Sequence, residues 1–238
     1  MTGSLVTTRR GMLCLGAVSA VLTLSGCKTT TSSEASPIGT PAPPPRRPVG
    51  PPSEEEMMLR YAPVVDEGHQ LPSIPFKEID PVFYRQRVEN TTGQAPGVVV
   101  VNVPKRFLYV TEPGGTAMRY GVGIGRAGFA WEGEGIIQWR QKWPRWKPPA
   151  EMIERQPELA KYSVENGGQE PGPNNALGAR ALYIFQNGKD TLYRLHGSKD
   201  WRSIGKAASS GCIRLINQDV IDLYARAPYK ARIVVQQS

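Results

Sequence analysis

The sequence lacks a hydrophobic run long enough to cross a bilayer as a helix. The uncharged stretch from Gly11 to Gly26 has 16 residues, whereas a spanning helix needs about 20. No internal repeat is present, and no combined basic and aromatic pattern indicates nucleic-acid binding. The short uncharged stretch, preceded by Arg9 and Arg10, instead fits the apolar region of a cleavable export signal.

The first 26 residues predict the signal peptide of a lipoprotein. The paired arginines resemble a twin-arginine export motif. The sequence does not distinguish export by this route from export by the Sec route. The run Leu24-Ser25-Gly26-Cys27 resembles a lipobox, in which the cysteine is acylated and becomes the mature N-terminus. The alternative is an ordinary cleaved signal with an incidental cysteine. Lys28 after the cysteine favours sorting to an outer membrane, and we expect a periplasm-facing lipoprotein of the cell envelope.

Cysteine is scarce, with three in 238 residues. Cys14 lies inside the expected signal, and Cys27 is the expected lipidation site. Cys212 is then the one free thiol of the mature protein. An oxidising export compartment favours paired structural cysteines, so a lone thiol there is either an inert buried residue or a reactive group.

Glycine and proline are abundant, at 25 and 22 residues, which favours a turn-rich β architecture. The formal charge of +8 becomes about +6 without the two signal arginines. A basic face suits anionic wall polymers or lipid, although scattered charges are equally compatible with a solvated surface.

The chain divides into four predicted parts. After the signal peptide at 1–26, residues 27–52 carry the lipidated cysteine and a proline-rich linker, in which eight of sixteen residues from Pro37 to Pro52 are proline. Residues 53–96 form a lead-in segment that starts with a short helix and packs against the main domain. Residues 97–236 form the main domain.

Short β runs dominate the main domain, which predicts a mainly β, sandwich or barrel-like fold with a few short helices. Asn187-Gly188 predicts a hairpin turn, because both residues tolerate positive φ. Asn217 is expected to cap a helix that runs to about Ala225. The expected strands are 97–103, 106–111, 116–123, 134–142, 181–186, 191–196 and 231–236, with a short helix at 150–156.

His196, at the end of a predicted strand, lies 16 positions before Cys212. An imidazole can accept a thiol proton and stabilise the thiolate. Gly211 allows close approach of a substrate carbonyl, and Arg214 offers fixed positive charge or a carboxylate clamp. Each residue also has an ordinary structural interpretation, but the combination favours a cysteine acyltransferase. His69, in the lead-in, is expected to be a surface residue.

In this chain the histidine precedes the cysteine, unlike the order in papain-like peptidases. The pattern resembles the L,D-transpeptidase (YkuD-type) catalytic domain, particularly its proteobacterial branch, over roughly residues 80–236. Some members carry a histidine where this chain has Ser210, so no role of that histidine is transferred. The resemblance is carried by 96–100, 119–125, 143–153, 177–183, 190–197 and Ser209-Ser210-Gly211-Cys212-Ile213-Arg214.

The resemblance implies that Cys212 forms a thioester with a peptidoglycan tetrapeptide stem, expels D-Ala, and transfers the stem to an amine. His196 would take the thiol proton, the Gly197 carbonyl would orient the imidazole, and the N–H groups of Gly211 and Cys212 would bind the oxyanion. No metal or cofactor is implied. Expected partners are stem peptides, wall-attached outer-membrane proteins and, through the lipid, a membrane, but no nucleic acid. Substrate binding is assigned to Arg214, Ser209, Ser210, Tyr193 and Trp146.

Two alternatives stay open from the sequence. A lipoprotein could hold peptidoglycan without chemistry, and the reactivity of Cys212 separates that class from an enzyme. In an L,D-carboxypeptidase, water would resolve the same thioester. We also expect Trp143, Trp146 and the loop to Asn175 to form a mobile flap over the cleft, with packing in a core as the alternative.

Overall fold

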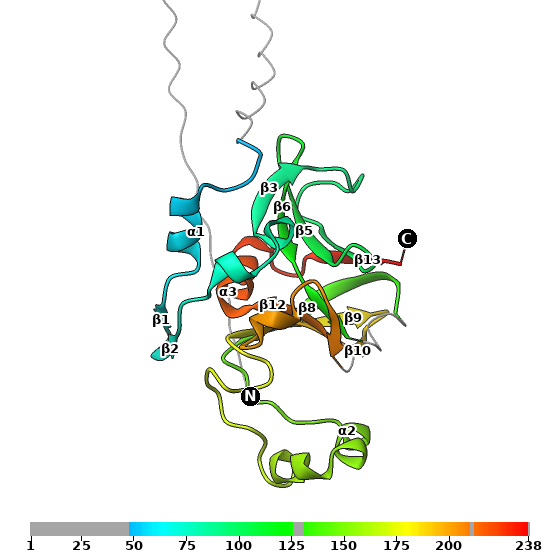
Figure 1. Cartoon of the computed structure of the whole chain (residues 1–238). Coiled ribbons are helices and arrows are strands. Elements are labelled where there is room, and N and C mark those ends of the chain that lie inside the picture. The colour runs from blue at the N-terminus through cyan, green and yellow to red at the C-terminus, as the bar shows by residue number, and fades with distance from the viewer. Residues whose placement is uncertain (1–47, 126–130, 210–211, 238) are drawn as a thin grey trace, which may run out of the picture. The chain divides into compact units, whose positions relative to one another are not determined.

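The structure is a computed structural model that describes residues 48–125, 131–209 and 212–237. Predictions for Cys27, Ser210 and Gly211 lie outside the described residues. Short strands dominate, as the sequence predicts (Figure 1). The strands are β1 (Val64–Asp66), β2 (His69–Leu71), β3 (Gln86–Glu89), β4 (Val99–Asn102), β5 (Phe107–Glu112), β6 (Thr116–Gly121), β7 (Gly123–Gly125), β8 (Gly133–Lys142), β9 (Arg180–Gln186), β10 (Lys189–Ser198), β11 (Ala207–Ser209), β12 (Ile213–Ile216) and β13 (Arg232–Gln236).

The helices are few and short. They are α1 (Glu54–Arg60), α2 (Ala150–Arg155) and α3 (Asn217–Arg226), with 3-10 turns η1 (Phe76–Glu78), η2 (Pro81–Phe83), η4 (Pro157–Tyr162) and η5 (Trp201–Ser203). No helix within the described ranges is long and apolar enough to cross a membrane.

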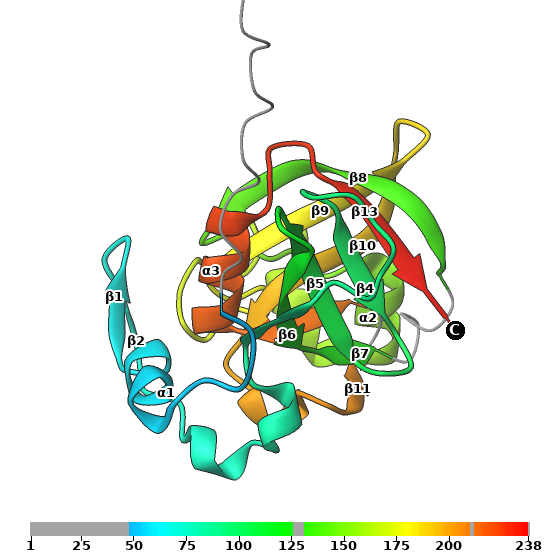
Figure 2. The ribbon, with the colours of Figure 1, turned by 90° about the horizontal axis from the view of Figure 1, so that it is seen from above.

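Eleven of the described strands form one mixed sheet, in the order β11-β7-β12-β10-β9-β8-β13-β4-β5-β6-β3. Only Val122 separates β6 from β7, yet these strands lie near opposite ends of that order. The sheet must therefore curl until its two ends meet, which confirms the mainly β, barrel-like prediction (Figure 2). The turn between β9 and β10 is also confirmed, because Asn187 and Gly188 both have positive φ.

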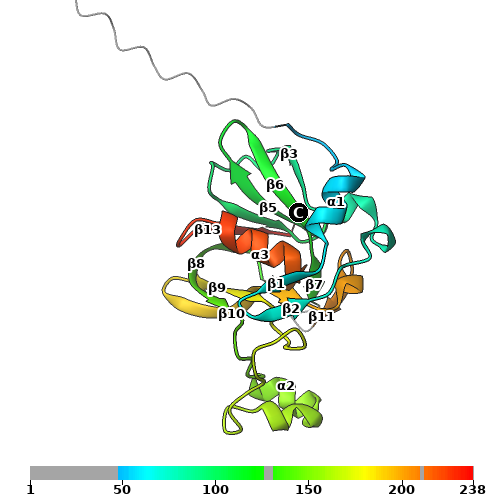
Figure 3. The same ribbon diagram turned by 90° about the vertical axis from the view of Figure 1, so that its left-hand side faces the viewer.

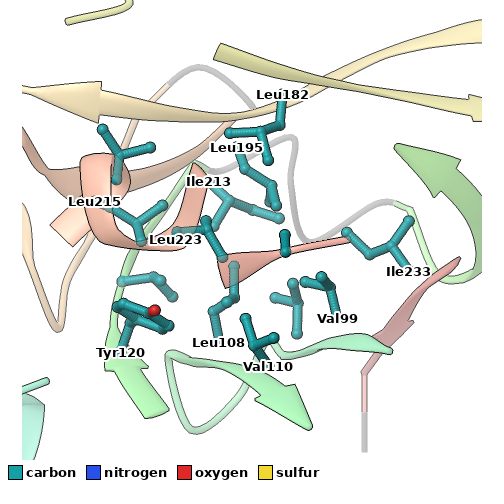
Figure 4. Close-up of a cluster of buried hydrophobic side chains, with 14 of the residues drawn as sticks. Val99, Leu108, Val110, Tyr120, Leu182, Leu195, Ile213, Leu215, Leu223 and Ile233 are labelled. Carbon is teal, nitrogen blue, oxygen red and sulfur yellow. The ribbon is translucent and has the colours of Figure 1, made fainter. Parts of the chain in front are cut away.

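Strand β4 explains the run of four valines. Val99 and Val101 are fully buried in the main core, whereas Val98 and Val100 belong to a second cluster on the other face. A strand buried on both faces reads as a continuous apolar run rather than an alternating one. Figure 4 shows part of the main core, where side chains from β4, β5, β10, β12 and α3 converge.

The lead-in packs against the main domain as predicted. Its helix α1 begins with a capping box formed by Ser53 and Glu56. Its strand β3 pairs antiparallel with β6 and so becomes the edge of the large sheet. The Tyr61 hydroxyl donates to Asp219 on α3 at 3.1 Å, which ties the lead-in to the last helix.

Helix α3 runs one residue beyond the predicted end, and its predicted cap is wrong. Ile216 is the N-cap residue and makes no side-chain cap hydrogen bond. The Asn217 amide oxygen instead accepts the backbone N–H of Ala179 at 2.9 Å. A buried backbone donor without a partner is costly, and this long-range demand outweighs the local capping preference.

Candidate active site

Strands β10 and β12 lie side by side and run parallel, with Leu195 opposite Ile213 and His196 opposite Arg214. Leu195 and Ile213 point into the core, as Figure 4 shows. Because side chains alternate along a strand, His196 and Arg214 share the opposite face of the sheet. Cys212 directly precedes β12 and continues the same alternation. The pairing therefore brings together the histidine and the cysteine that the sequence separates by 16 positions.

His196 is held in one orientation. Its Nδ1 lies 2.8 Å from the carbonyl oxygen of Gly197, which confirms the predicted contact. A carbonyl only accepts, so Nδ1 carries the proton and Nε2 is the acceptor of the neutral ring. The pKa of His196 is lowered to about 4, chiefly by burial; the Gly197 carbonyl acts against this shift, and the charges of Arg214 and Arg194 act with it. At neutral pH the imidazole is therefore an unprotonated base.

Gly197 leaves room for this arrangement. A Cβ on Gly197 would lie 2.2 Å from Oδ1 of Asn217, the atom that accepts the N–H of Ala179. Gly178, with φ of +61°, approaches the same oxygen and the carbonyl of Gly197. Side chains at these glycines would push α3 away from β10 and displace the backbone that orients His196.

Cys212 is half-buried, and its carbonyl accepts the N–H of Gly125 at 3.2 Å, which ties it to β7. It is the one cysteine within the described ranges, and its thiol is free of disulfide bonding. Burial raises the pKa of the thiol, while the backbone N–H of Arg194 and the charges of Arg194 and Arg214 lower it. The site thus combines a thiol, an oriented neutral imidazole and two nearby arginines, and a thiol with an adjacent base is chemically suited to nucleophilic attack.

The comparisons with known proteins agree with this geometry. Residues 96–235 match the YkuD family, described as the L,D-transpeptidase catalytic domain. This chain belongs to that family. The match covers more than half of the chain and includes β4 to β13, with His196 and Cys212 inside it.

Curated relatives carry the same family name. "Probable L,D-transpeptidase ErfK/SrfK" of Escherichia coli K12 is 30% identical over 145 residues, and its Salmonella typhimurium counterpart is 33% identical over 141 residues. Each match covers 58% of this chain and 43% of the relative. The chain therefore spans less than half of the length of these curated relatives.

Two solved structures are also similar to this chain. A Brucella melitensis protein described as a probable carnitine operon oxidoreductase is 45% identical, covers 65% of this chain and 94% of its own, and has a TM-score of 0.46. L,D-transpeptidase 3 of Mycobacterium tuberculosis, in complex with a faropenem-derived adduct, is 15% identical, with 60% and 61% covered and a TM-score of 0.43. Both TM-scores are below 0.5, so the assignment of this chain to the family rests on the match of residues 96–235 to the family model.

The predicted substrate-binding residues of this L,D-transpeptidase-family site fall into four groups, of which Trp146 is described below together with Trp143. Arg214 is half-buried on the face that carries Cys212. Tyr193 packs against the core and stacks on Trp131 with ring centroids 5.5 Å apart, so the structure does not place it beside the nucleophile. Ser209 ends β11, which pairs with β7, and Ser210 lies outside the described residues.

The predicted flap is wrong for Trp143. This residue is 6% exposed and belongs to the core, where its indole N–H donates to Asp66 at 2.7 Å. The His69 ring packs against the Trp143 ring, tilted by 34° with ring centroids 4.1 Å apart, and His69 is half-buried, which corrects the prediction that it is a surface residue. Asp66 lies on the lead-in strand β1 and His69 on the lead-in strand β2. These two strands therefore bury Trp143, for which the sequence allowed either a flap or a core position.

Trp146 behaves differently from Trp143. It is half-buried, and its backbone pairs with Gln169 within the segment that carries α2 and η4. Figure 3 shows this segment as a lobe beside the curled sheet. The ring of Trp146 faces Tyr162 at 6.3 Å. A role of Trp146 in substrate binding stays a prediction.

The two tryptophans give a matched pair of variants. Trp146→Ala should weaken substrate binding, measured as a higher KM, and should change Tm little, because the half-buried ring contributes little to the core. Trp143→Ala should destabilise the fold by about 3–5 kcal/mol, because it removes a buried indole and its hydrogen bond. Steady-state kinetics and thermal unfolding of both variants measure the difference. Equal losses of Tm and activity in Trp146→Ala would place Trp146 in the structural core instead.

The predicted site lacks one residue that lies beside Cys212. Arg194 shares the face of His196, two positions earlier on β10, and its guanidinium lies 4.4 Å from the ring centroid of Tyr183 on β9. The signal was the alternation along 191–196, which places Arg194 with His196. The predicted hairpin already sets β9 beside β10, but the sequence did not show the register shift between Asp190 and Arg194 that places Arg194 opposite Tyr183.

Two cavities lie elsewhere. One, of about 310 Å³, and the other, of about 400 Å³, share Trp201 as a wall, and neither is lined by Cys212 or His196. Within the described residues, no group of three or more His, Cys, Asp and Glu side chains is placed to hold a metal ion.

Proposed function

We propose that this chain is a cysteine-dependent L,D-transpeptidase that acts on peptidoglycan stem peptides. The observation that carries the proposal is the oriented, neutral His196 on the strand beside Cys212. Membership of the L,D-transpeptidase family supplies the reaction class. The substrate is a tetrapeptide stem, cleaved between the L-centre of its third residue and the terminal D-Ala.

The reaction follows from the chemistry of the two residues. Cys212 passes its proton to Nε2 of His196, and the thiolate adds to the carbonyl carbon of the third residue. The N–H groups of Gly211 and Cys212 stabilise the oxyanion. The intermediate collapses to a thioester, and D-Ala leaves with the proton from His196. An amine acceptor then attacks the thioester, gives its proton to His196, and the thiol is regenerated.

The acceptor defines the product. A second stem gives a 3→3 crosslink, a protein amine gives a wall-attached protein, and a free D-amino acid gives an exchanged stem. Water would make the chain an L,D-carboxypeptidase. Incubation with purified tetrapeptide muropeptides, followed by mass spectrometry, distinguishes these products by mass. Binding without any change in mass would favour the non-catalytic wall-binding module.

We further propose that Cys27 is acylated and anchors the enzyme in the outer membrane. The support is the run Leu24-Ser25-Gly26-Cys27 after an uncharged stretch, with Lys28 next. Mass spectrometry of the N-terminal peptide from membrane fractions should show diacyl or triacyl Cys27 and no residues before it. An intact signal, or a mature N-terminus elsewhere without lipid, would refute the anchor and leave the catalytic proposal untouched.

A further inference from the structure

One row of residues crosses the three neighbouring strands β8, β9 and β10 and ends at Cys212, directly before β12. Trp139 on β8 is opposite Tyr183 on β9, and Tyr183 is opposite Arg194 on β10. Leu195 is opposite Ile213, so the parallel register places Arg194 opposite Cys212. Trp139 stacks on Tyr183 with ring centroids 4.6 Å apart, and the guanidinium of Arg194 lies over the Tyr183 ring. Arg194 is therefore the member of this row that adjoins the thiol.

The guanidinium of Arg194 is fixed on several sides. Its Nη1 and Nη2 each donate to one carboxylate oxygen of Asp190 at 2.7 Å, and Nη1 also donates to the carbonyl of Tyr193 at 2.9 Å. The side chain is 14% exposed. A bidentate ion pair and an aromatic face hold a planar guanidinium in one place. Arg194 is therefore a stationary charge, with Nη1 and Nη2 both donating within the protein.

A fixed positive charge near Cys212 would offset the cost of burying its thiolate. Burial disfavours both a thiolate at Cys212 and an imidazolium at His196. Among the described residues, Arg194 and Arg214 are the charged groups that act on both, with Asp190 paired to Arg194 and Asp200 acting on Arg214. The strand β7 that pairs with β12 is Gly123–Gly125 and carries no titratable side chain.

Arg194 and Arg214 differ in which group each affects more, Cys212 or His196. At Cys212 the charge of Arg194 acts more strongly than that of Arg214, and the backbone N–H of Arg194 adds to it. At His196 the order is reversed, and Arg214 acts more strongly.

We propose that Arg194 is a positioning residue for the nucleophile: its guanidinium, fixed by Asp190 and Tyr183, supplies the positive potential that stabilises the thiolate of Cys212. Asp190 has two opposing effects, since it holds the cation in place and partly cancels its field. The inference rests on the proposed role of Cys212 as the nucleophile. It concerns the ionisation of the thiol, which can be measured without any wall substrate.

The test is the pH dependence of alkylation of Cys212 in the full chain by iodoacetamide. This reagent is neutral, so a change of protein charge does not change its local concentration. The label is quantified on the Cys212 peptide by mass spectrometry, which separates it from the other cysteines. The variants are Arg194→Gln, Arg194→Lys and Asp190→Asn, with Tyr183→Phe as the packing control.

We expect opposite shifts. Arg194→Gln should move the midpoint of the alkylation profile up by about 0.5–1 pH unit, less than a bare neighbouring charge produces because Asp190 already offsets part of it. Below the midpoint, alkylation should then be about three- to tenfold slower. Asp190→Asn should move the midpoint down, because it removes the opposing charge and keeps a hydrogen-bond acceptor. Arg194→Lys should recover part of the shift, and Tyr183→Phe should leave the midpoint unchanged.

Shifts of Arg194→Gln and Asp190→Asn in the same direction, or no shift in either, would overturn the proposal. If Arg194→Gln does not fold, the Asp190→Asn midpoint alone decides, since an unchanged or raised midpoint contradicts the electrostatic role. A correct pattern of shifts in an enzyme that makes no transpeptidation product would refute the proposed function and leave the role of Arg194 in place.

Discussion

Replacement of Cys212 by serine should reduce turnover of tetrapeptide stems by several orders of magnitude, with little change in Tm. The serine hydroxyl keeps the shape of the side chain, but its proton is far harder to remove than that of a thiol, and a lone imidazole activates it poorly. His196→Ala should lose a comparable factor. The double variant should lose little more, because residues that act as one unit are strongly non-additive.

The measurement is single-turnover release of D-Ala, together with the mass of the protein after exposure to a carbapenem. The wild-type thiol should gain the mass of the drug, by resemblance to the family, and Cys212→Ser should stay unmodified. Thermal unfolding of His196→Ala is required, because this histidine is 4% exposed and its loss leaves a cavity. Full turnover by Cys212→Ser, or additive losses in the double variant, would contradict the proposed pair.

Arg85→Ala should lower the free energy of unfolding by about 3–5 kcal/mol, the range found when one partner of a buried ion pair is removed. Arg85 lies in the lead-in, and its guanidinium approaches Asp219 at 3.5 Å and Asp222 at 3.4 Å on α3. The Asp219 side chain is 1% exposed. Without Arg85, its charge would be left buried, with the Tyr61 hydroxyl as hydrogen-bond donor and the weaker effect of the Arg60 charge. Chemical denaturation at pH 7 measures the loss.

The pH dependence gives a second check on Asp219. Burial raises the pKa of Asp219 to about 6, although Arg85 and Tyr61 act against this rise. The folded pKa exceeds the unfolded value of about 3.9, so the folded state binds more protons between these values, and ionisation of Asp219 costs stability as pH rises. The deficit of Arg85→Ala should therefore be largest at pH 7 and shrink toward pH 4, where Asp219 is protonated.

A matched control uses an exposed ion pair. Arg145 and Glu170 have side chains that are 41% and 73% exposed, so Arg145→Ala should cost about 0–1 kcal/mol at pH 7. A similar loss in both arginine variants, or a deficit in Arg85→Ala that is independent of pH, would show that the buried ion pair does not anchor the lead-in.

Local patterns predicted most of the strands, because each depends on neighbouring residues. The valine run at 98–101 became β4, and Asn187-Gly188 became the turn between β9 and β10. The failures came where a distant partner outweighed a local preference. Asn217 serves Ala179 rather than capping its own helix, and Trp143 is buried because Asp66 and His69 cover it from the lead-in.

The sequence by itself predicted the proposed reactive pair from one cysteine apart from the expected signal and lipidation site, a histidine at the end of a predicted strand, and the motif that resembles the family. Only the tertiary structure decided what surrounds them. The parallel pairing of β10 with β12 sets His196 and Arg194 beside Cys212, and the register with β9 places Tyr183 under Arg194. The local turn at Asn187-Gly188 specifies that β9 and β10 pair, but it does not specify the register shift between Asp190 and Arg194 or the parallel pairing with β12. These depend on how the curled sheet buries both of its faces.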